Sequence, residues 1–358
     1  MAARVTLADI ARASGVSRFT VARILKGETK GKWAVSAERI AEIKALAEKM
    51  GYRVNSAARA TATGRFDAAA LLTPNEGGDY LPIGVVRALV SHLAEHDQHL
   101  VIERLPRDQL GEEDRLPKLL RELSVDGFFL SHATDLPPAL LHLIREGGGV
   151  PAVWLNAPER FDAVHPDDEG AAYQAVHRMY QTGRRRIAYQ PPLYGPPLIR
   201  YTGDTRTLAG WDVIDPKKER HYSQSARESG YLRACAELGV APQVFTPLPR
   251  PFADAVQAAE ATMAAHTFDA VLAFGDPAPQ IWRLAAARSG RRLPEDLALA
   301  TFAWEHFDLA AEGLSGMVLE TWHYARSAVD LLQAKLAEPT VRQPCAVVPW
   351  VWFDGGSV

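Results

Sequence analysis

The chain has 358 residues, of which 47% are hydrophobic, and a formal net charge of −3 at pH 7. This length favours two or three domains with an ordinary hydrophobic core, whereas two cysteines, Cys235 and Cys345, exclude a disulfide framework. The sequence contains no uninterrupted run of about 18 apolar residues, so no membrane span is expected. The opening sequence MAARVTLADI lacks an apolar signal region, so we expect a cytoplasmic protein.

Positive charge is concentrated at the N-terminal end. Residues 1–65 contain 13 Lys and Arg against 5 Asp and Glu, a balance of +8, which leaves −11 for the rest of the chain. A basic segment joined to an acidic body is typical of a duplex-binding module attached to a domain that does not bind DNA. A basic surface that is merely solvated is the alternative.

The segment Thr6–Leu25, TLADIARASGVSRFTVARIL, predicts two short helices joined by a tight turn at Gly15. Thr6 and Ser17 are suited to cap them. The apolar positions that would face a small core are Leu7, Ile10, Ala11, Val16, Val21, Ile24 and Leu25. The second helix begins with basic and hydroxyl-bearing residues, which is typical of a helix-turn-helix that places this helix in the DNA major groove. A helical hairpin without that function is the alternative.

A third helix is expected over Ala37–Met50, capped by Ser36 and ended by Gly51. Its apolar side would close a three-helix core through Ile40, Ile43, Leu46 and Ala47.

The run TLADIARASGVSRFTVAR resembles the DNA-binding head of the LacI (lactose repressor) family of bacterial regulators. The similarity continues through Val35-Ser36 and through the residues from Gly51 to Asn55. It implies a DNA-binding domain over residues 1–54 and a hinge over residues 55–66.

Within this resemblance, we expect Arg18 and Arg23 to read bases, because a guanidinium can form two hydrogen bonds to guanine. Phe19 occupies another base-reading position and would pack against a thymine methyl group. The family usually has Ser where this chain has Ala22, so one phosphate contact is expected to be missing. The expected phosphate contacts are Thr6, Ser17, Thr20, Ser36 and Lys26.

In the resembling family, the hinge becomes a helix on operator DNA and inserts a leucine into the minor groove. Here Asn55, Ala58 and Arg59 carry over, whereas Thr61 stands at the position of the leucine. A threonine is a poor wedge, because unstacking a base step needs an apolar side chain. Groove-width recognition by Arg59 or Arg65 is the weaker alternative.

From Asp67 onward, short apolar runs alternate with amphipathic helical segments, which predicts parallel sheets covered by helices. The expected strands are Ala68–Leu72, His99–Glu103, Gly127–Ser131, Ala152–Leu155, Arg186–Gln190, Val244–Pro247, Ala270–Phe274, Leu297–Phe302 and Cys345–Val351. The expected helices are Pro82–Glu95, Glu113–Leu123, Pro138–Glu146, Glu169–Thr182, Ser225–Leu238, Ala253–Ala265, Pro279–Arg288 and Thr321–Glu338.

The fold class expected is therefore an all-α helix-turn-helix head followed by an α/β body over residues 67–358. The body resembles the type I periplasmic-binding-protein fold, with two doubly wound parallel-sheet lobes around a ligand cleft. We expect one lobe over residues 67–190 and 316–338, and the other over residues 191–315 and 339–358. The segment Pro191–Tyr222 is some twenty residues longer than the family uses and predicts a lid or an added dimer surface.

Four positions that line the family's sugar cleft correspond here to Asn156, Arg227, Gly275 and Ala303. Gly275 and Ala303 replace an amide and a carboxylate that bind sugar hydroxyls. Asp276, Thr73 and Tyr80 complete the expected effector site. A sugar or glycoside is the favoured effector, an acidic or aromatic ligand held by Arg227 is the next, and loss of effector response is a third possibility. Arg227 could instead serve as a salt bridge between the lobes.

No nucleophile–base–acid arrangement is recognisable, so we expect no enzyme activity and no cofactor. His92, His96 and His99 lack supporting cysteine or carboxylate ligands, so no metal site is expected. The sequence therefore predicts an effector-controlled transcriptional regulator, a repressor, that binds a palindromic double-stranded operator as a homodimer. The alternatives are a small-molecule binding module and a constitutive DNA-binding protein with a non-responsive body.

Overall fold

The computed structural model describes residues 5–26, 35–53, 60, 64–74, 81–105, 122, 124–131, 142, 144, 150–193, 198–201, 211–214, 221–249 and 251–358. The chain forms two compact units, Met1–Phe66 and Asp67–Val358, called here the head and the body. Several predictions lie outside the described residues: the hinge residues Asn55, Ala58, Arg59 and Thr61, the effector residue Tyr80, and most of the helices expected at 113–123 and 138–146.

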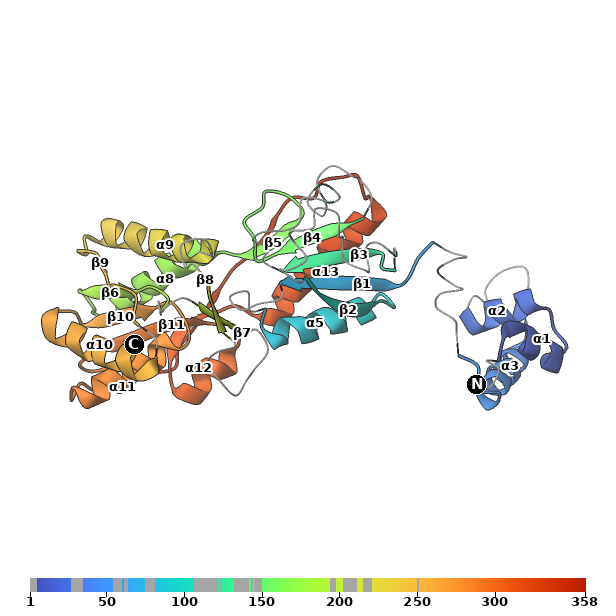
Figure 1. Ribbon diagram of the computed structural model, residues 1–358, viewed down its shortest axis with the longest axis horizontal. Coiled ribbons are helices and arrows are strands. Elements are labelled where there is room, and N and C mark those ends of the chain that lie inside the picture. Colours follow the sequence, from blue (N-terminus) through green and yellow to red (C-terminus); the bar gives the residue numbers. More distant parts are fainter. Residues whose placement is uncertain are drawn as a thin grey trace. The chain divides into compact units, whose positions relative to one another are not determined.

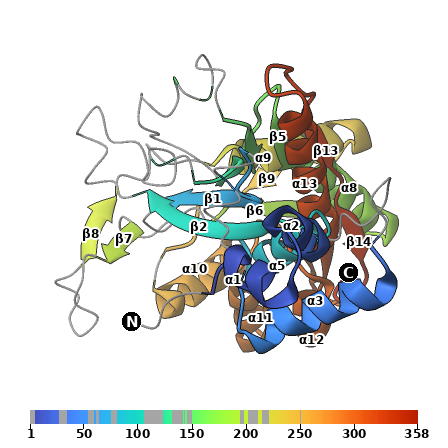
Figure 2. The same ribbon diagram turned by 90° about the vertical axis from the view of Figure 1, so that its right-hand side faces the viewer.

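In the described part of the head, three helices pack against one another, α1 (Leu7–Ser14), α2 (Arg18–Lys26) and α3 (Ala37–Lys49) (Figures 1 and 2). The residues buried between them are Ile10, Val21, Ile24, Ile43 and Ala47, all of which the helical spacing had predicted to face inward.

The head helices have the expected ends. Thr6 caps α1 in a capping box with Asp9, whose carboxylate accepts from the Thr6 backbone N–H at 3.0 Å. Gly15 ends α1 with a φ of 68°, which favours glycine. After α3, Gly51 has a φ of 70°, and the N–H of Tyr52 donates to the carbonyl of Ala47, as in a Schellman motif. The end of α1 at Gly15 confirms the predicted tight turn between α1 and α2.

The first sheet of the body is parallel throughout, with strand order β13-β5-β4-β3-β1-β2. Its strands are β1 (Ala68–Pro74), β2 (His99–Leu105), β3 (Gly127–Ser131), β4 (Ala152–Leu155), β5 (Ala163–Pro166) and β13 (Ala346–Val348). Helices α5 (Ile83–Ala94) and α13 (Thr321–Ala337) pack together beside this sheet (Figure 1). We call this part the first lobe.

The second sheet has strand order β14-β12-β11-β10-β6-β9, with only β14 antiparallel to its neighbour among the pairs described. Its strands are β6 (Ile187–Gln190), β9 (Gln243–Val244), β10 (Ala270–Ala273), β11 (Ala298–Ala303), β12 (Ser315–Val318) and β14 (Val351–Phe353). Its helices are α8 (Asp168–Gln181), α9 (Tyr222–Leu238), α10 (Phe252–Ala265), α11 (Ala278–Arg288) and α12 (His306–Glu312). A separate hairpin pairs β7 (Leu198–Tyr201) with β8 (Trp211–Ile214). The part around the second sheet is the second lobe.

Helices cover both faces of the second sheet. Ala270 and Leu272 of β10 belong to the core that includes α8 and α9, whereas Val271 and Ala273 belong to the core that includes α10 and α11. This period-two alternation with every residue buried is what a central parallel strand requires. It confirms that the apolar runs are strands of sheets covered by helices.

The chain crosses between the lobes three times through short segments. These are Asp167 between β5 and α8, Leu319–Glu320 between β12 and α13, and Pro349–Trp350 between β13 and β14. Three one- or two-residue connections restrict the lobes to hinge-like motion about a common cleft.

Strand pairing corrects the lobe boundaries predicted from the sequence. The strand at Ile187–Gln190 pairs with β10 of the second sheet, so the first crossing falls at Asp167 rather than after residue 190. Likewise, β12 lies in the second lobe and β13 in the first. The strand expected over Cys345–Val351 is in fact two strands in different sheets. An apolar run predicts a buried strand, but it does not indicate which sheet the strand joins.

Also not predicted from the sequence were β5, β7, β8, β12 and α12, all of which are short. Within the described residues, no helix is long and apolar enough to cross a membrane.

Candidate functional site

The exposed side of α2 carries the three residues expected to read bases. Arg18 is exposed, and Phe19 has 72% of its surface accessible to solvent. The guanidinium of Arg23 lies 5.9 Å from the centre of the Phe19 ring. An aromatic side chain this exposed on a small domain is unfavourable in water, and its position beside two arginines is typical of a binding surface.

The hydroxyl residues expected to contact phosphate all lie at helix N-termini of the head. Thr6 and Ser36 cap α1 and α3, and Ser17 accepts a hydrogen bond from the Thr20 backbone N–H at 3.1 Å at the start of α2. Backbone N–H groups and the helix dipole make such termini favourable for anions. Lys26 is the last residue of α2, and its side chain lies outside the described part.

The body contains a cleft of about 800 Å³ between its lobes. Its walls include residues at the carboxyl ends of strands from both sheets, such as Ser131 of β3, Pro166 of β5 and Ala303 of β11. The carboxyl ends of parallel strands are where α/β proteins bind ligands, and the volume suits a small molecule.

The cleft brings together five of the residues predicted for effector binding, Asn156, Arg227, Gly275, Asp276 and Ala303. Thr73 of β1 is not among its lining residues. Residues that the sequence analysis missed also line it: Ser131, Asp168, His221, Glu305, Asp308 and Trp350. A search for polar or aromatic residues just after each predicted strand would have found Glu305, which follows β11, but not Asp168 or Trp350, whose neighbouring strands were misassigned.

Arg227 is held inside the protein rather than projecting freely into the cleft. It is 7% exposed, its Nε donates to Asp168 Oδ1 at 2.7 Å, and its Nη1 donates to the Phe274 carbonyl at 2.6 Å. The guanidinium lies 4.1 Å from the ring centre of Phe302, 4.4 Å from that of Phe274 and 5.0 Å from that of Trp350. Its partner Asp168 is the first residue of α8, where the helix dipole favours a carboxylate. Arg227 and Asp168 both lie in the second lobe. Their ion pair is therefore not the salt bridge between the lobes that the sequence analysis considered as an alternative role for Arg227.

His221 connects the two lobes beside this pair. A carbonyl oxygen can only accept, so His221 Nε2 carries the proton and donates to the Asn156 carbonyl at 3.1 Å. Nδ1 is then free to accept from the Ser223 N–H at 3.2 Å and cap α9. Burial and, to a smaller extent, the Arg227 charge lower the pKa of His221 to about 4. The neutral imidazole is therefore the form that satisfies both partners.

Tyr222 makes a second contact between the lobes at the same place. Its hydroxyl donates to Asn156 Oδ1 at 3.4 Å, and its ring packs edge-on against His165 of β5. Burial raises the pKa of Tyr222, and the nearby charge of Asp168 raises it further. Asn156 itself has a φ of 57°, an unusual backbone conformation that asparagine tolerates.

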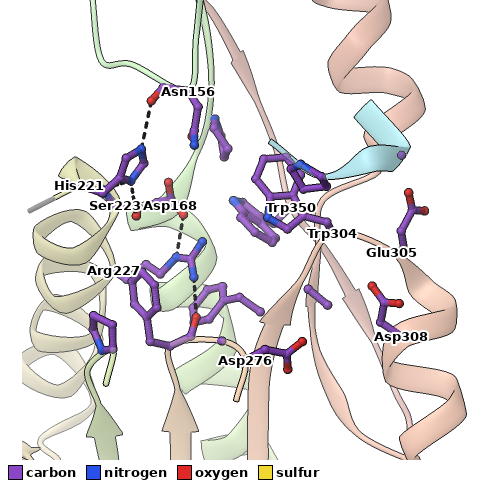
Figure 3. A pocket seen from close by; sticks show the side chains of 18 of the residues that line it. Asn156, Asp168, His221, Ser223, Arg227, Asp276, Trp304, Glu305, Asp308 and Trp350 are labelled. Carbon is purple, nitrogen blue, oxygen red and sulfur yellow. Dashed lines mark hydrogen bonds and ion pairs between the residues drawn. The ribbon is translucent and has the colours of Figure 1, made fainter. Parts of the chain in front are cut away.

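Carboxylates and aromatic rings line much of the remaining cleft. Figure 3 shows Asp168, Arg227 and His221 on one side, Glu305, Asp308 and Asp276 on the other, and Trp304 and Trp350 between them. We call Asp276, Glu305 and Asp308 the acidic wall. Such a site offers flat apolar faces and hydrogen-bond acceptors to a ligand.

His92 has a structural environment. It is buried in α5, contacts the Glu95 carboxylate at 3.0 Å and the Trp322 carbonyl at 3.1 Å, and packs against the Trp322 ring. In the part of the chain that the structure describes, no three His, Cys, Asp or Glu residues are grouped so as to hold a metal ion.

A helix-turn-helix head joined to a two-lobed body with a ligand-sized cleft defines a class of DNA-binding proteins with a small-molecule binding domain. Comparison with known families gives two matches. Residues 6–55 match the bacterial regulatory proteins of the lacI family, and residues 205–358 match the periplasmic binding protein-like domain.

Similar curated proteins are named as regulators. The chain is 28% identical over 319 residues to the HTH-type transcriptional regulator CelR of Thermobifida fusca, covering 84% of this chain and 82% of CelR. It is 28% identical to AglR of Rhizobium meliloti and 30% identical to PtxS of Pseudomonas putida, over 63% and 54% of this chain. These two alignments span less than two thirds of the relatives, 64% of AglR and 56% of PtxS.

Solved structures share the fold over nearly the whole chain. A lac repressor dimer bound to operator has a TM-score of 0.73 at 17% identity, covering 99% of both chains. A complex of the transcriptional regulator CelR with cellobiose has a TM-score of 0.61 at 24% identity, covering 99% of this chain and 100% of that chain. The head thus matches the DNA-binding domain of the lacI family, and the C-terminal part of the body matches the periplasmic binding protein-like domain.

Arg227→Met should destabilise the body by about 3–5 kcal/mol, because it leaves the buried Asp168 carboxylate without its counter-ion. Arg233→Met is the matched control on the same helix: Arg233 forms an exposed ion pair with Glu169 of α8, and its loss should cost less than about 1 kcal/mol. Adding Asp168→Asn to Arg227→Met should recover part of the loss. Urea denaturation measures all three free energies of unfolding, and equal costs for the two single variants would contradict the structural role of Arg227.

Acid should destabilise the protein through His221. Because its folded-state pKa of about 4 lies below its ordinary value, the unfolded chain takes up the proton first, and stability is lost as the pH falls from about 6.5 towards 4. At about pH 5 this loss is about 2 kcal/mol. His221→Asn keeps a capping acceptor that does not titrate, so urea denaturation at about pH 7.5 and pH 5 should show a smaller acid effect in the variant. The same acid effect in both proteins would rule out His221 as its source.

Proposed function

We propose that the protein is a sequence-specific DNA-binding transcriptional regulator, a repressor, whose operator affinity responds to a small molecule in the cleft of the body. The observation that carries this proposal is the exposed side of α2, where Arg18, Phe19 and Arg23 stand on the second helix of a helix-turn-helix.

The chemistry of this helix suits base recognition in the major groove. Arg18 and Arg23 can each form two hydrogen bonds to a guanine edge, and Phe19 can bury its exposed ring against a thymine methyl group. Thr6, Ser17, Thr20 and Ser36 place hydroxyls and backbone N–H groups at helix ends, where phosphates bind. Lys26 adds a positive charge at the end of α2.

We propose that two copies act together. One head reads only a half-site, and a twofold dimer matches a palindromic operator. The lac repressor, which shares the fold, has been solved as a dimer bound to operator, and this supports the same arrangement here.

We propose a sugar-related effector. Trp304 and Trp350 line the cleft, and flat apolar faces of this kind pack against sugar rings. The relative CelR has been solved with cellobiose, which supports a carbohydrate ligand in a cleft of this fold. An acidic ligand held by Arg227 is disfavoured, because Arg227 already bonds to Asp168 and to the Phe274 carbonyl.

The contacts between the lobes suggest how ligand and DNA binding are coupled. His221 and Tyr222 reach Asn156 on one side of the cleft, and Thr321 of the first lobe donates to Glu305 of the second at 2.7 Å on the other. Gly84 of α5 leaves room for the Glu305 carboxylate, because a Cβ at this position would lie 2.1 Å from Glu305 Oε1 and would require that side chain to shift. A ligand that favours one arrangement of these contacts shifts the population of lobe positions and thereby the operator affinity of the dimer.

Arg23→Ala should weaken binding to the operator far more than binding to random DNA, by about 1–3 kcal/mol for the operator, because it removes a base contact. The operator is first selected from a random duplex library with the wild-type protein. Lys44→Ala, which removes an exposed charge from α3, is the control and should weaken both DNAs alike. An equal loss on both DNAs for Arg23→Ala, measured in the same salt, would contradict the assignment of Arg23.

Phe307→Ala should weaken effector binding, because Phe307 lines the cleft with 70% of its surface exposed. The control is Phe252→Ala. Phe252 lies at the start of α10, outside the cleft, and is 45% exposed. A thermal-shift screen with sugars identifies a ligand that raises the melting temperature of the wild type. The shift should decrease in Phe307→Ala and persist in Phe252→Ala. Equal shifts in all three proteins would place the ligand elsewhere.

A further inference from the structure

The described lining of the cleft is negatively charged. Among the residues that the structure describes, its charged members are two arginines, Arg87 and Arg227, and four carboxylates, Asp168 and the three of the acidic wall. His221 is neutral at pH 7 because its pKa lies near 4. These described residues therefore carry a formal charge of −2, and an anionic ligand would meet net repulsion from them.

The acidic wall has hydrogen-bond donors but no counter-ion in the described ranges. Gln280 donates to Asp276 at 3.0 Å, and Thr321 donates to Glu305 at 2.7 Å. Neither donor carries a charge. Asp308 makes no hydrogen bond or ion pair with the residues that the structure describes. Asp308 is exposed, but partial desolvation raises its pKa, and the charges of Glu305 and Asp276 raise it further.

Two buried polar atoms in the same cleft also lack partners among the described residues. Asp168 is 2% exposed, and its Oδ2 accepts no hydrogen bond, while Trp350 is 4% exposed, and its Nε1 donates none. A buried polar atom without a partner is costly, by about 1–3 kcal/mol. These two atoms need one donor and one acceptor from a ligand, and a hydroxyl group supplies both.

We propose that the effector is a hydroxylated ring that carries a protonated amine, an amino sugar in chemical class, with its ammonium group facing the acidic wall. Its hydroxyls meet Asp168 and Trp350, and its ring lies along Trp304. This proposal rests on the proposed function, of which it specifies the ligand.

The side chains on one side of the cleft favour a cation. Gly275 and Ala303 line the cleft but provide no side-chain hydrogen bond to a ligand. The residues that follow them closely in the chain, Asp276 and Glu305, are acidic and lie on the same side of the cleft (Figure 3). The polar groups here are therefore charged, which favours a cation over a neutral hydroxyl.

The test compares three sugars that differ only in charge: a hexosamine, the corresponding neutral hexose and the corresponding hexuronic acid. The same comparison is repeated with the amine, neutral and acidic forms of a disaccharide. Isothermal titration at pH 7 with the full-length protein should give the order amine, neutral, acid, with the amine about fivefold tighter than the neutral sugar. At about pH 9.5, above the ordinary pKa of such an amine, this preference should disappear.

Asp308→Asn should reduce the preference for the amine two- to threefold and leave the affinity for the neutral sugar unchanged. Asp254→Asn removes an exposed carboxylate of α10 outside the cleft and should leave both unchanged. Equal or tighter binding of the neutral or acidic probe, an amine preference that Asp308→Asn does not reduce, or no binding by any probe would overturn the proposal. Operator selection by the ligand-free protein tests DNA binding separately, so the amine proposal can fail while the proposed function stands.

Discussion

Three short connections between two sheets determine the architecture of the body. One residue at Asp167 and two residues at each of the other crossings leave the lobes no freedom to separate, yet they permit hinge motion about the cleft. They also bring the carboxyl ends of both parallel sheets to the same place, so that residues distant in sequence, such as Ser131 and Trp350, line one cavity. The site exists because the chain passes repeatedly between the lobes.

The interactions around these crossings explain why the cleft is both stable and selective. Asp168 follows the first crossing and fixes Arg227, whose charge is satisfied by a carboxylate, a carbonyl and aromatic rings. Because the Arg227 guanidinium already binds these groups, it holds the rings of the cleft in position and leaves little positive charge for a ligand. We propose that recognition then falls to the tryptophans and to the acidic wall, and that contacts such as the one between His221 and Asn156 respond to lobe closure.

The sequence predicted the head in detail because its signals are local. Caps at Thr6 and Ser36, the turn at Gly15 and the apolar spacing of Ile10, Val21 and Ile43 each act within a few residues. Most strands of the body were predicted for the same reason. The sheet to which each strand belongs was not predicted. The strand Ile187–Gln190, for example, pairs with β10, which lies some eighty residues further along the chain. The partners of Arg227 and the capping role of His221 likewise depend on the assembled fold, and no spacing rule reveals them.

We propose that the cleft and the DNA-binding head are thermodynamically linked. The direct measurement is the operator affinity with and without saturating cleft ligand, together with the ligand affinity with and without saturating operator, in one buffer. Such linkage predicts that both affinities change by the same factor, about tenfold or more. A ligand that saturates the cleft and leaves the operator affinity unchanged would contradict it.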